Sequence, residues 1–111
     1  MLELKEMLEE LNIPIAYDHF NTATNPPCVT FRRDSTRNFG ADNKVYKKIN
    51  NYVVQLYTEY KDPALEEQLE DIFDANDVFY DIASEDYIED EKMYEMIYEV
   101  TLESDNFVAS I

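Results

Sequence analysis

The sequence has very few of the residues from which most catalytic and metal-binding sites are built. Its 111 residues include one cysteine, one histidine and one glycine, and no tryptophan. The single cysteine, Cys28, excludes an intramolecular disulfide and a zinc site made of paired cysteines. With one glycine, the chain also lacks a glycine-rich loop of the kind that binds phosphates. We therefore expect no catalytic residues, no metal site and no cofactor, and predict that the protein is not an enzyme.

Basic residues and long apolar runs are scarce too. Nine Lys and Arg stand against 25 Asp and Glu, which gives a formal net charge of −16. This charge disfavours binding to the outside of nucleic acid, where affinity comes from neutralising phosphates, and to anionic membrane surfaces. No apolar run reaches the length of a membrane span, and residues 1–12 carry four Glu instead of a basic start and an apolar core. We expect neither a membrane span nor a signal peptide, and a reducing, intracellular setting suits the lone cysteine.

What the sequence does have is enough apolar surface for one core. Hydrophobic residues make up 45% of the chain, and a length of 111 residues is typical of a single domain, so we predict one domain over residues 1–111. A first amphipathic helix should end near Asn12, because the residue before Pro14 is pushed out of the helical region. Its apolar face is formed by Leu4, Leu8 and Leu11.

A second helix should follow Asp62, which is suited to the N-cap, with Pro63 in the first turn where its missing N–H costs nothing. Its core-facing side chains are predicted to be Leu65, Leu69, Ile72 and Phe73.

Alternating apolar residues predict five strands. They are expected near residues 13–17, 28–34, 44–57, 77–83 and 94–102. The last two carry Val78, Tyr80 and Ile82, and Tyr94, Met96, Tyr98, Val100 and Leu102, on one face. Residues 84–91 are interpreted as an acidic turn. The polar stretch that contains Gly40 predicts a long connection at about residues 34–45. The expected fold is α+β, in the order α-β-β-loop-β-α-β-β, with two helices packed on one face of a mostly antiparallel sheet.

Isolated residues with chemical potential have simpler interpretations. Cys28 should be a small buried side chain in a strand, and His19 a partly exposed residue at a strand end. The acidic runs at residues 71–77 and 85–91 could bind a divalent cation, but the first lacks the glycine and the closing Glu of a calcium loop. We interpret both runs as solvated turns.

The basic residues are strongly segregated. Residues 32–48 hold six of the nine, against Asp34 and Asp42, so this segment carries +4 and the remainder −20. Such asymmetry predicts head-to-tail association, in which this segment of one copy meets the acidic surface of the next. The alternative is a solvated hairpin whose charges balance within the subunit. The predicted subunit or connector interface consists of Arg32, Arg33, Arg37, Phe39, Lys44, Tyr46, Lys47 and Lys48.

Three stretches carry a resemblance that covers most of the chain. They are NFGADNKVYKKINNY at residues 38–52, YTEYKDP at residues 57–63 and EDEKMYEMIYEV at residues 89–100. The chain resembles small structural proteins of the head-tail module of long-tailed bacteriophages and of prophages of Gram-positive bacteria. These proteins are called tail terminator, tail completion or head-tail joining proteins.

The resemblance implies a homo-oligomeric ring, usually a hexamer, that joins the phage tail tube to the head connector. The implied partners are the tail tube protein and a head connector or stopper protein, with DNA only passing through the lumen. The implied location is the virion tail at the head-tail interface, after assembly in the host cytoplasm. An alternative hypothesis is an acidic DNA-mimic inhibitor of a host nucleic-acid-binding protein. A third is an enzyme, which a ligand or metal in a cleft would favour.

Overall fold

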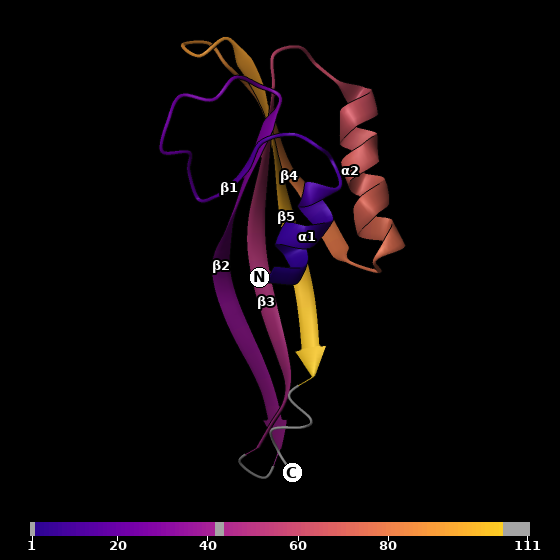
Figure 1. The fold of residues 1–111 in the computed structure, drawn as a ribbon. Coiled ribbons are helices and arrows are strands. Elements are labelled where there is room, and N and C mark those ends of the chain that lie inside the picture. Colours follow the sequence, from indigo (N-terminus) through magenta and orange to yellow (C-terminus); the bar gives the residue numbers. More distant parts are fainter. Residues whose placement is uncertain (1, 42–43, 106–111) are drawn as a thin grey trace.

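The computed structural model describes residues 2–41 and 44–105, and for residues 2, 37–41, 44–48, 104 and 105 it describes the backbone alone. The chain forms two helices and five strands (Figure 1). In order, these elements are α1 (Leu2–Glu9), β1 (Ile15–Tyr17), β2 (Cys28–Ala41), β3 (Lys44–Thr58), α2 (Pro63–Ala75), β4 (Phe79–Ile88) and β5 (Met93–Asp105). The predicted α+β class, with two helices and a mostly antiparallel sheet, is confirmed.

The strands form one sheet in the order β1-β2-β3-β5-β4. β1 pairs with β2 in parallel, and the pairs β2–β3, β3–β5 and β4–β5 are antiparallel. β3 therefore lies in the centre, β4 forms one edge, and short β1 covers only part of the other edge. Both helices lie on the same face of the sheet (Figure 1), as the sequence predicts.

The core lies between the helices and this covered face. The predicted alternation in β3 and β5 is confirmed, because side chains on one side of each strand are almost completely buried while their neighbours are not. The buried set joins the two helices to the sheet and includes Leu4, Leu8, Leu11, Val54, Leu56, Leu69, Phe73, Tyr98 and Val100. No helix among residues 2–41 and 44–105 is long and apolar enough to cross a bilayer.

Helix α2 begins and ends where local chemistry dictates. The Asp62 side chain accepts a hydrogen bond from the backbone N–H of Leu65 at 3.1 Å, and Pro63 occupies the first turn, which confirms the predicted N-cap. At the other end, Asp77 takes a positive φ of 54°, a region that Asp and Asn tolerate better than most residues. The chain then returns so that the Val78 N–H donates to the Phe73 carbonyl at 2.9 Å.

The predicted long connection at residues 34–45 is wrong. β2 continues to Ala41 and β3 begins at Lys44, so most of this stretch is paired strand. β5 remains paired with β3 as far as Lys47. We call residues 32–41 and 44–51 the β2–β3 arm. It projects well beyond the helices (Figure 1) and makes the molecule long, with extents of 52 × 27 × 22 Å. Its polar composition suggested a loop, but polar side chains bond across the strands, as Thr36 Oγ1 does to Asn50 Oδ1 at 3.0 Å.

Two details of β4 also differ from expectation. Residues 84–88, interpreted as part of an acidic turn, continue the strand, and the reversal comes at residues 89–92, where Lys92 has a φ of 52°. Val78 and Tyr80 are buried or half-buried as predicted, but Ile82 is 52% exposed. Ile82 lies on the edge strand, next to an irregularity in the pairing with β5, and so receives no cover from a further strand within the described residues.

Candidate subunit interface

Two of the eight predicted interface residues have side chains that the structure describes, and both lie where the arm leaves the body. Arg32 is opposite Val53, and its Nη1 lies 3.6 Å from Oδ1 of Asp34, an exposed ion pair of little energetic weight. Arg33 is exposed, and its backbone N–H donates to the Tyr17 hydroxyl at 3.1 Å. The guanidinium groups of both residues are open to solvent and available to a partner.

The other predicted residues lie further along the same arm. In the backbone register Arg37 is opposite Ile49, Phe39 is opposite Lys47 and Asn38 is opposite Lys48. Lys44 and Tyr46 belong to β3 near the tip. The side chains of Arg37, Phe39, Lys44, Tyr46, Lys47 and Lys48 lie outside what the structure describes. The fold thus brings all eight predicted positions onto the β2–β3 arm, which the sequence analysis assigned to a loop and the adjoining strands. β5 borders the β3 side of this arm, with Ser104 opposite Lys48 and Asp105 opposite Lys47.

The face of the sheet opposite the helices carries hydrogen-bonded polar rows. Thr30 Oγ1 donates to Gln55 Oε1 at 3.0 Å, and Gln55 Nε2 donates to Glu95 Oε2 at 3.1 Å. Burial, with the carboxylate of Glu95 beside it, raises the pKa of Tyr57 to about 12. Half-buried Val53 lies among these groups. This face therefore combines paired polar groups with partly exposed apolar surface.

A second polar row ties the base of the arm to β5. Asn51 Nδ2 donates to Ser35 Oγ at 2.9 Å, and Thr101 Oγ1 donates to Asn51 Oδ1 at 3.0 Å. Asn51 therefore links three strands on the uncovered face. The arm is continuous with the sheet of the body and keeps its direction from it.

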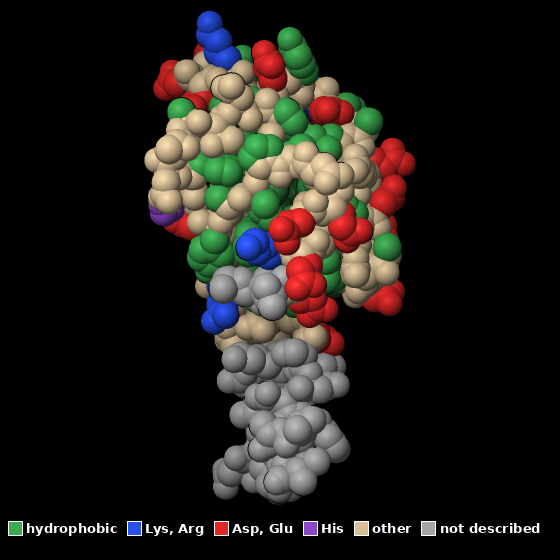
Figure 2. Space-filling model, in the orientation of Figure 1, with side chains coloured by type: hydrophobic (Ala, Val, Ile, Leu, Met, Phe, Trp, Pro, Cys, Tyr) green, Lys and Arg blue, Asp and Glu red, His purple; other side chains and the backbone are tan. Residues whose placement is uncertain are grey.

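Edge strand β4 exposes large apolar and acidic side chains together. Phe79 is 67% exposed, Ile82 52% and Tyr87 51%. Asp81, Glu85 and Asp86 are exposed on the same strand. Acidic side chains also gather over α2, where Lys and Arg are few (Figure 2). The body thus offers acidic surface on two elements, whereas the arm is basic.

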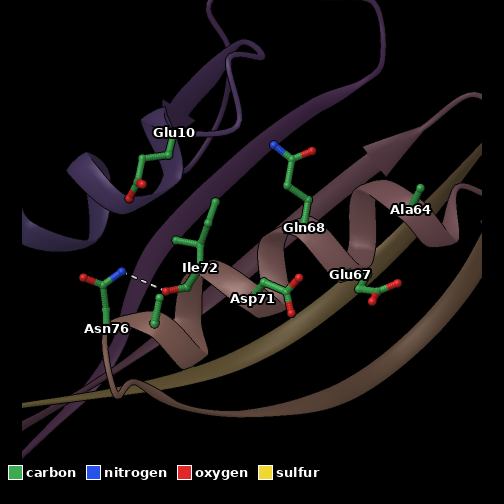
Figure 3. Close-up of a pocket in the computed structure, with 8 residues that line it drawn as sticks. Glu10, Ala64, Glu67, Gln68, Asp71, Ile72 and Asn76 are labelled. Carbon is green, nitrogen blue, oxygen red and sulfur yellow. Dashed lines mark hydrogen bonds between the residues drawn. The ribbon is translucent and has the colours of Figure 1, made fainter.

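A groove between the end of α1 and helix α2 has a volume of about 450 Å³. Glu10 borders it from the α1 side, and Glu67, Gln68, Asp71, Ile72 and Asn76 border it from α2 (Figure 3). The Asn76 amide donates to the Ile72 carbonyl at 2.8 Å, so it closes the helix end. The groove contains no nucleophile beside a base, and no group of His, Cys, Asp and Glu within the described ranges could hold a metal ion.

The isolated residues behave as the simpler interpretations predict. Cys28 is 4% exposed in β2, and burial raises the pKa of its thiol, which makes it unreactive. The His19 side chain is 69% exposed just after β1, with Nδ1 2.8 Å from Oδ2 of Asp18. Neither residue lies in a cleft described above.

Sequence reasoning missed an ion cluster that joins the loop before α2 to α2 and β4. Lys61 Nζ lies 2.9 and 2.8 Å from the two carboxylate oxygens of Glu66 and also bonds to Glu85. The Glu66 residue is 8% exposed, which is unusual for a carboxylate in the first turn of a helix. The only signal in the sequence was a lone Lys next to the cap of α2. The cluster fixes α2 against β4. It also gives the Glu85 carboxylate a partner within the chain, so no metal ion is needed to explain its position.

Comparison with known proteins adds no identity. No family model matches the chain, and no curated protein matches its sequence. Function must therefore be argued from the arm, the charges and the sequence resemblance.

Proposed function

We propose that this protein is a structural subunit that assembles head to tail into a ring, with its β2–β3 arm as the main contact to the next copy. The observation that carries the proposal is the arm itself. It is an extension of the sheet, bordered by the end of β5, in which residues 32–48 hold six of the nine Lys and Arg of a chain with net charge −16. A basic projection on an acidic body is complementary to a second copy of that body.

The polarity of the contact favours a ring over a twofold dimer. Arm-to-arm contact would place basic segments together, and body-to-body contact would oppose the carboxylates over α2 and β4. Arm-to-body contact joins unlike surfaces, and repeated application of such a contact closes into a ring when its rotation allows.

The virion role rests on the sequence resemblance. On that basis the ring is a tail terminator or tail completion ring that joins a phage tail tube to the head connector, and DNA passes through its lumen. The acidic charge suits this role, because an acidic lumen does not hold DNA as a basic one would. Hexameric stoichiometry and the partners, a tail tube protein and a connector or stopper protein, belong to the same proposal, as does the absence of catalysis.

The first experiment reverses the charge at the tip of the arm. Lys47→Glu with Lys48→Glu should leave the fold intact and weaken self-association by about tenfold or more. The loss should be larger at low salt, where the attraction in the unaltered protein is least screened. Light scattering coupled to gel filtration, at 50 and 300 mM salt over a concentration series, measures the effect.

The matched control is Lys5→Glu with Lys92→Glu, which makes the same change in net charge at two exposed positions outside the arm. Its association should equal that of the unaltered protein. A strict monomer that binds neither tail tubes nor connectors, by electron microscopy, would refute the proposal. A monomer that instead captures a nucleic-acid-binding protein and is displaced by DNA would favour the inhibitor hypothesis.

A further inference from the structure

The sheet has two edges that a second copy could extend. β4 forms one edge, and its outer side has no strand partner within the described residues. On the other edge, β1 pairs only with Val29, Thr30 and Phe31 of β2. From Arg32 onward, β2 pairs with β3 on one side and with no described strand on the other. The Arg33 N–H donates to the Tyr17 hydroxyl of β1, so a strand added at Arg33 would replace this bond. Unpaired strand edges of this kind are templates for strand addition.

The charges on these two edges have mirrored spacing. On β4, Asp81, Glu85 and Asp86 are separated by four positions and then by one. On β2, Arg32, Arg33 and Arg37 are separated by one position and then by four. Because antiparallel strands run in opposite directions, a single register places each of these three arginines of β2 opposite an acidic residue of β4. The pairs are Arg32 with Asp86, Arg33 with Glu85 and Arg37 with Asp81.

The two faces of the sheet agree with this register. Arg32 is opposite Val53 and Asp86 is opposite Glu95, both on the uncovered face. Arg33 is opposite Tyr52 and Glu85 is opposite Met96, both on the helix-covered face. Since residues directly opposite in an antiparallel pair share a face, both described pairs satisfy the requirement.

The third pair fits by its place in the backbone. Asp81 is opposite Glu99, and the Arg37 position is opposite Ile49; both belong to the rows of the uncovered face. Each strand also has one irregularity inside the four-residue interval, between Arg33 and Ser35 in β2 and between Ile82 and Ser84 in β4. In the register given above the two irregularities fall beside each other.

We propose that β4 of one copy pairs antiparallel with β2 of the next, residues 79–86 against residues 32–39, so that the sheet continues from subunit to subunit. This inference rests on the proposed head-to-tail assembly and names its acceptor surface. The strand directions allow it, because β4 runs antiparallel to β2 within the sheet. Pairing of β4 with a second β4 would oppose carboxylates, and pairing of β2 with a second β2 would oppose arginines.

Pairing in this register displaces neighbouring subunits along the strands. Within one subunit Tyr80 is level with Arg33 through Val100 and Tyr52, whereas in the proposed pairing it is opposite Asn38. Arg33 and Asn38 are opposite Tyr52 and Lys48 in β3, so the displacement is four steps of the ladder, about 13 Å at about 3.3 Å per residue, across four strands that together span about 19 Å. These values give a strand tilt of roughly 35°, at the lower end of the usual range for closed barrels. A closed ring of continuous sheet is therefore geometrically consistent.

Exchange of the charges tests the pairing. Asp81→Arg with Asp86→Arg, and separately Arg32→Asp with Arg37→Asp, should each weaken self-association by at least about tenfold. The protein with all four substitutions should regain association, because each pair is restored with its signs exchanged. Glu85 is left unchanged, since it also bonds to Lys61. The control Glu89→Arg with Asp90→Arg, in the exposed turn beyond β4, should associate normally.

A cross-link tests the register without charge reversal. Asp81→Cys and Arg37→Cys, placed in separate copies and mixed, should form a disulfide-linked heterodimer on mild oxidation. The pair Asp86→Cys and Arg37→Cys should not form this disulfide. In the proposed register Asp86 is opposite Arg32, five positions from Arg37, which is too far for a disulfide to span. Mass spectrometry of the mixed proteins reads out both, and Cys28 is too buried to compete.

The outcomes separate the two proposals. In one outcome the unaltered protein assembles and the Lys47 and Lys48 reversals disrupt assembly, but neither the β4 reversals nor the protein with all four substitutions differs from the unaltered protein. Head-to-tail assembly then stands, and the proposed β4 acceptor is wrong. If the off-register cysteines link as well as the predicted pair, the register is wrong. If the unaltered protein stays monomeric, both proposals fail.

Discussion

The two faces of this sheet are built from the same strands and differ in almost everything else. On the covered face Val54, Leu56 and Tyr98 are 0% exposed and pack under two helices. On the opposite face their sequence neighbours Val53 and Gln55 are only half-buried. Adjacent residues in one strand thus serve different purposes, because successive side chains point to opposite sides.

The difference shows that the side chains that stabilise the fold lie on one face of the sheet, and the side chains open to solvent lie on the other. Apolar area removed from water contributes most of the favourable free energy of folding, and this protein concentrates it on the covered face. The uncovered face holds its polar groups in pairs, as in the Thr30, Gln55 and Glu95 row, and keeps them satisfied at a partly wet surface. The uncovered face can therefore change its contacts without dismantling the core.

The largest effect should come from emptying the centre of the covered face. Phe73 is 0% exposed, and its ring lies 5.4 Å from that of Tyr80 and 6.1 Å from that of Tyr98. Phe73→Ala should lower the free energy of unfolding by about 3–5 kcal/mol. Urea denaturation followed by circular dichroism measures it. Phe73→Leu should cost clearly less, and equal losses for the two variants would contradict the packing argument.

A smaller loss should follow from breaking the ion cluster at the rim of the covered face. Lys61→Met keeps an apolar side chain of similar length but removes the ammonium group that bonds to the Glu66 carboxylate. Glu66 is only 8% exposed, so its charge is left without a partner in a largely buried place. We expect a loss of about 1–3 kcal/mol in the free energy of unfolding, measured by urea denaturation at pH 7. Adding Glu66→Gln should recover part of the loss, because it removes the unpaired charge. A double variant less stable than Lys61→Met would argue against this account.

The smallest effect should come from the uncovered face and should depend on pH. The pKa of Tyr57 is about 12 in the folded protein, against about 10 for an unperturbed tyrosine. Between these values the unfolded chain has lost the phenolic proton and the folded chain has kept it, so stability falls as pH rises. Tyr57→Phe should flatten this fall, measured by urea midpoints from pH 9 to 11. At pH 7 the two proteins should differ by about 1 kcal/mol or less, and parallel pH profiles would contradict the assignment.

Local chemistry was sufficient to predict much of the fold. Asp62 and Pro63 located the start of α2, and the alternation from Tyr94 to Leu102 located β5 and its buried side, because capping and strand periodicity act within a few residues. The β2 side of the long arm could not be found in this way, although the β3 side was predicted as strand from Lys44. Ser35 and Thr36 resemble loop residues in sequence, and only their partners Asn51 and Asn50 across the sheet show them to be strand.

The candidate interface was only partly predictable, because one side of it is a local pattern in the sequence and the other depends on strand pairing. The clustering of Arg32, Arg33 and the basic residues that follow is a property of the sequence and needed no structure. The acceptor proposed on β4 could not be predicted from the sequence, because Glu85 and Asp86 fall in an acidic stretch typical of a turn, and only the pairing with β5 shows that they belong to an edge strand. The Lys61 cluster depends on contacts between elements that are distant in sequence, and no local pattern reports it.

The central place of β3 sets an order of events during synthesis on the ribosome. β3 needs β5 on its inner side, and the two are far apart in the chain: Thr101 bonds to Asn51, 50 positions earlier. While α2, β4 and β5 are still being made, a nascent chain holds Val54 and Leu56 on a strand with one open edge. Such edges invite association with other chains, and the acidic charge of the emerging segments opposes it. The sheet is completed only when its last strand arrives between two that are already made.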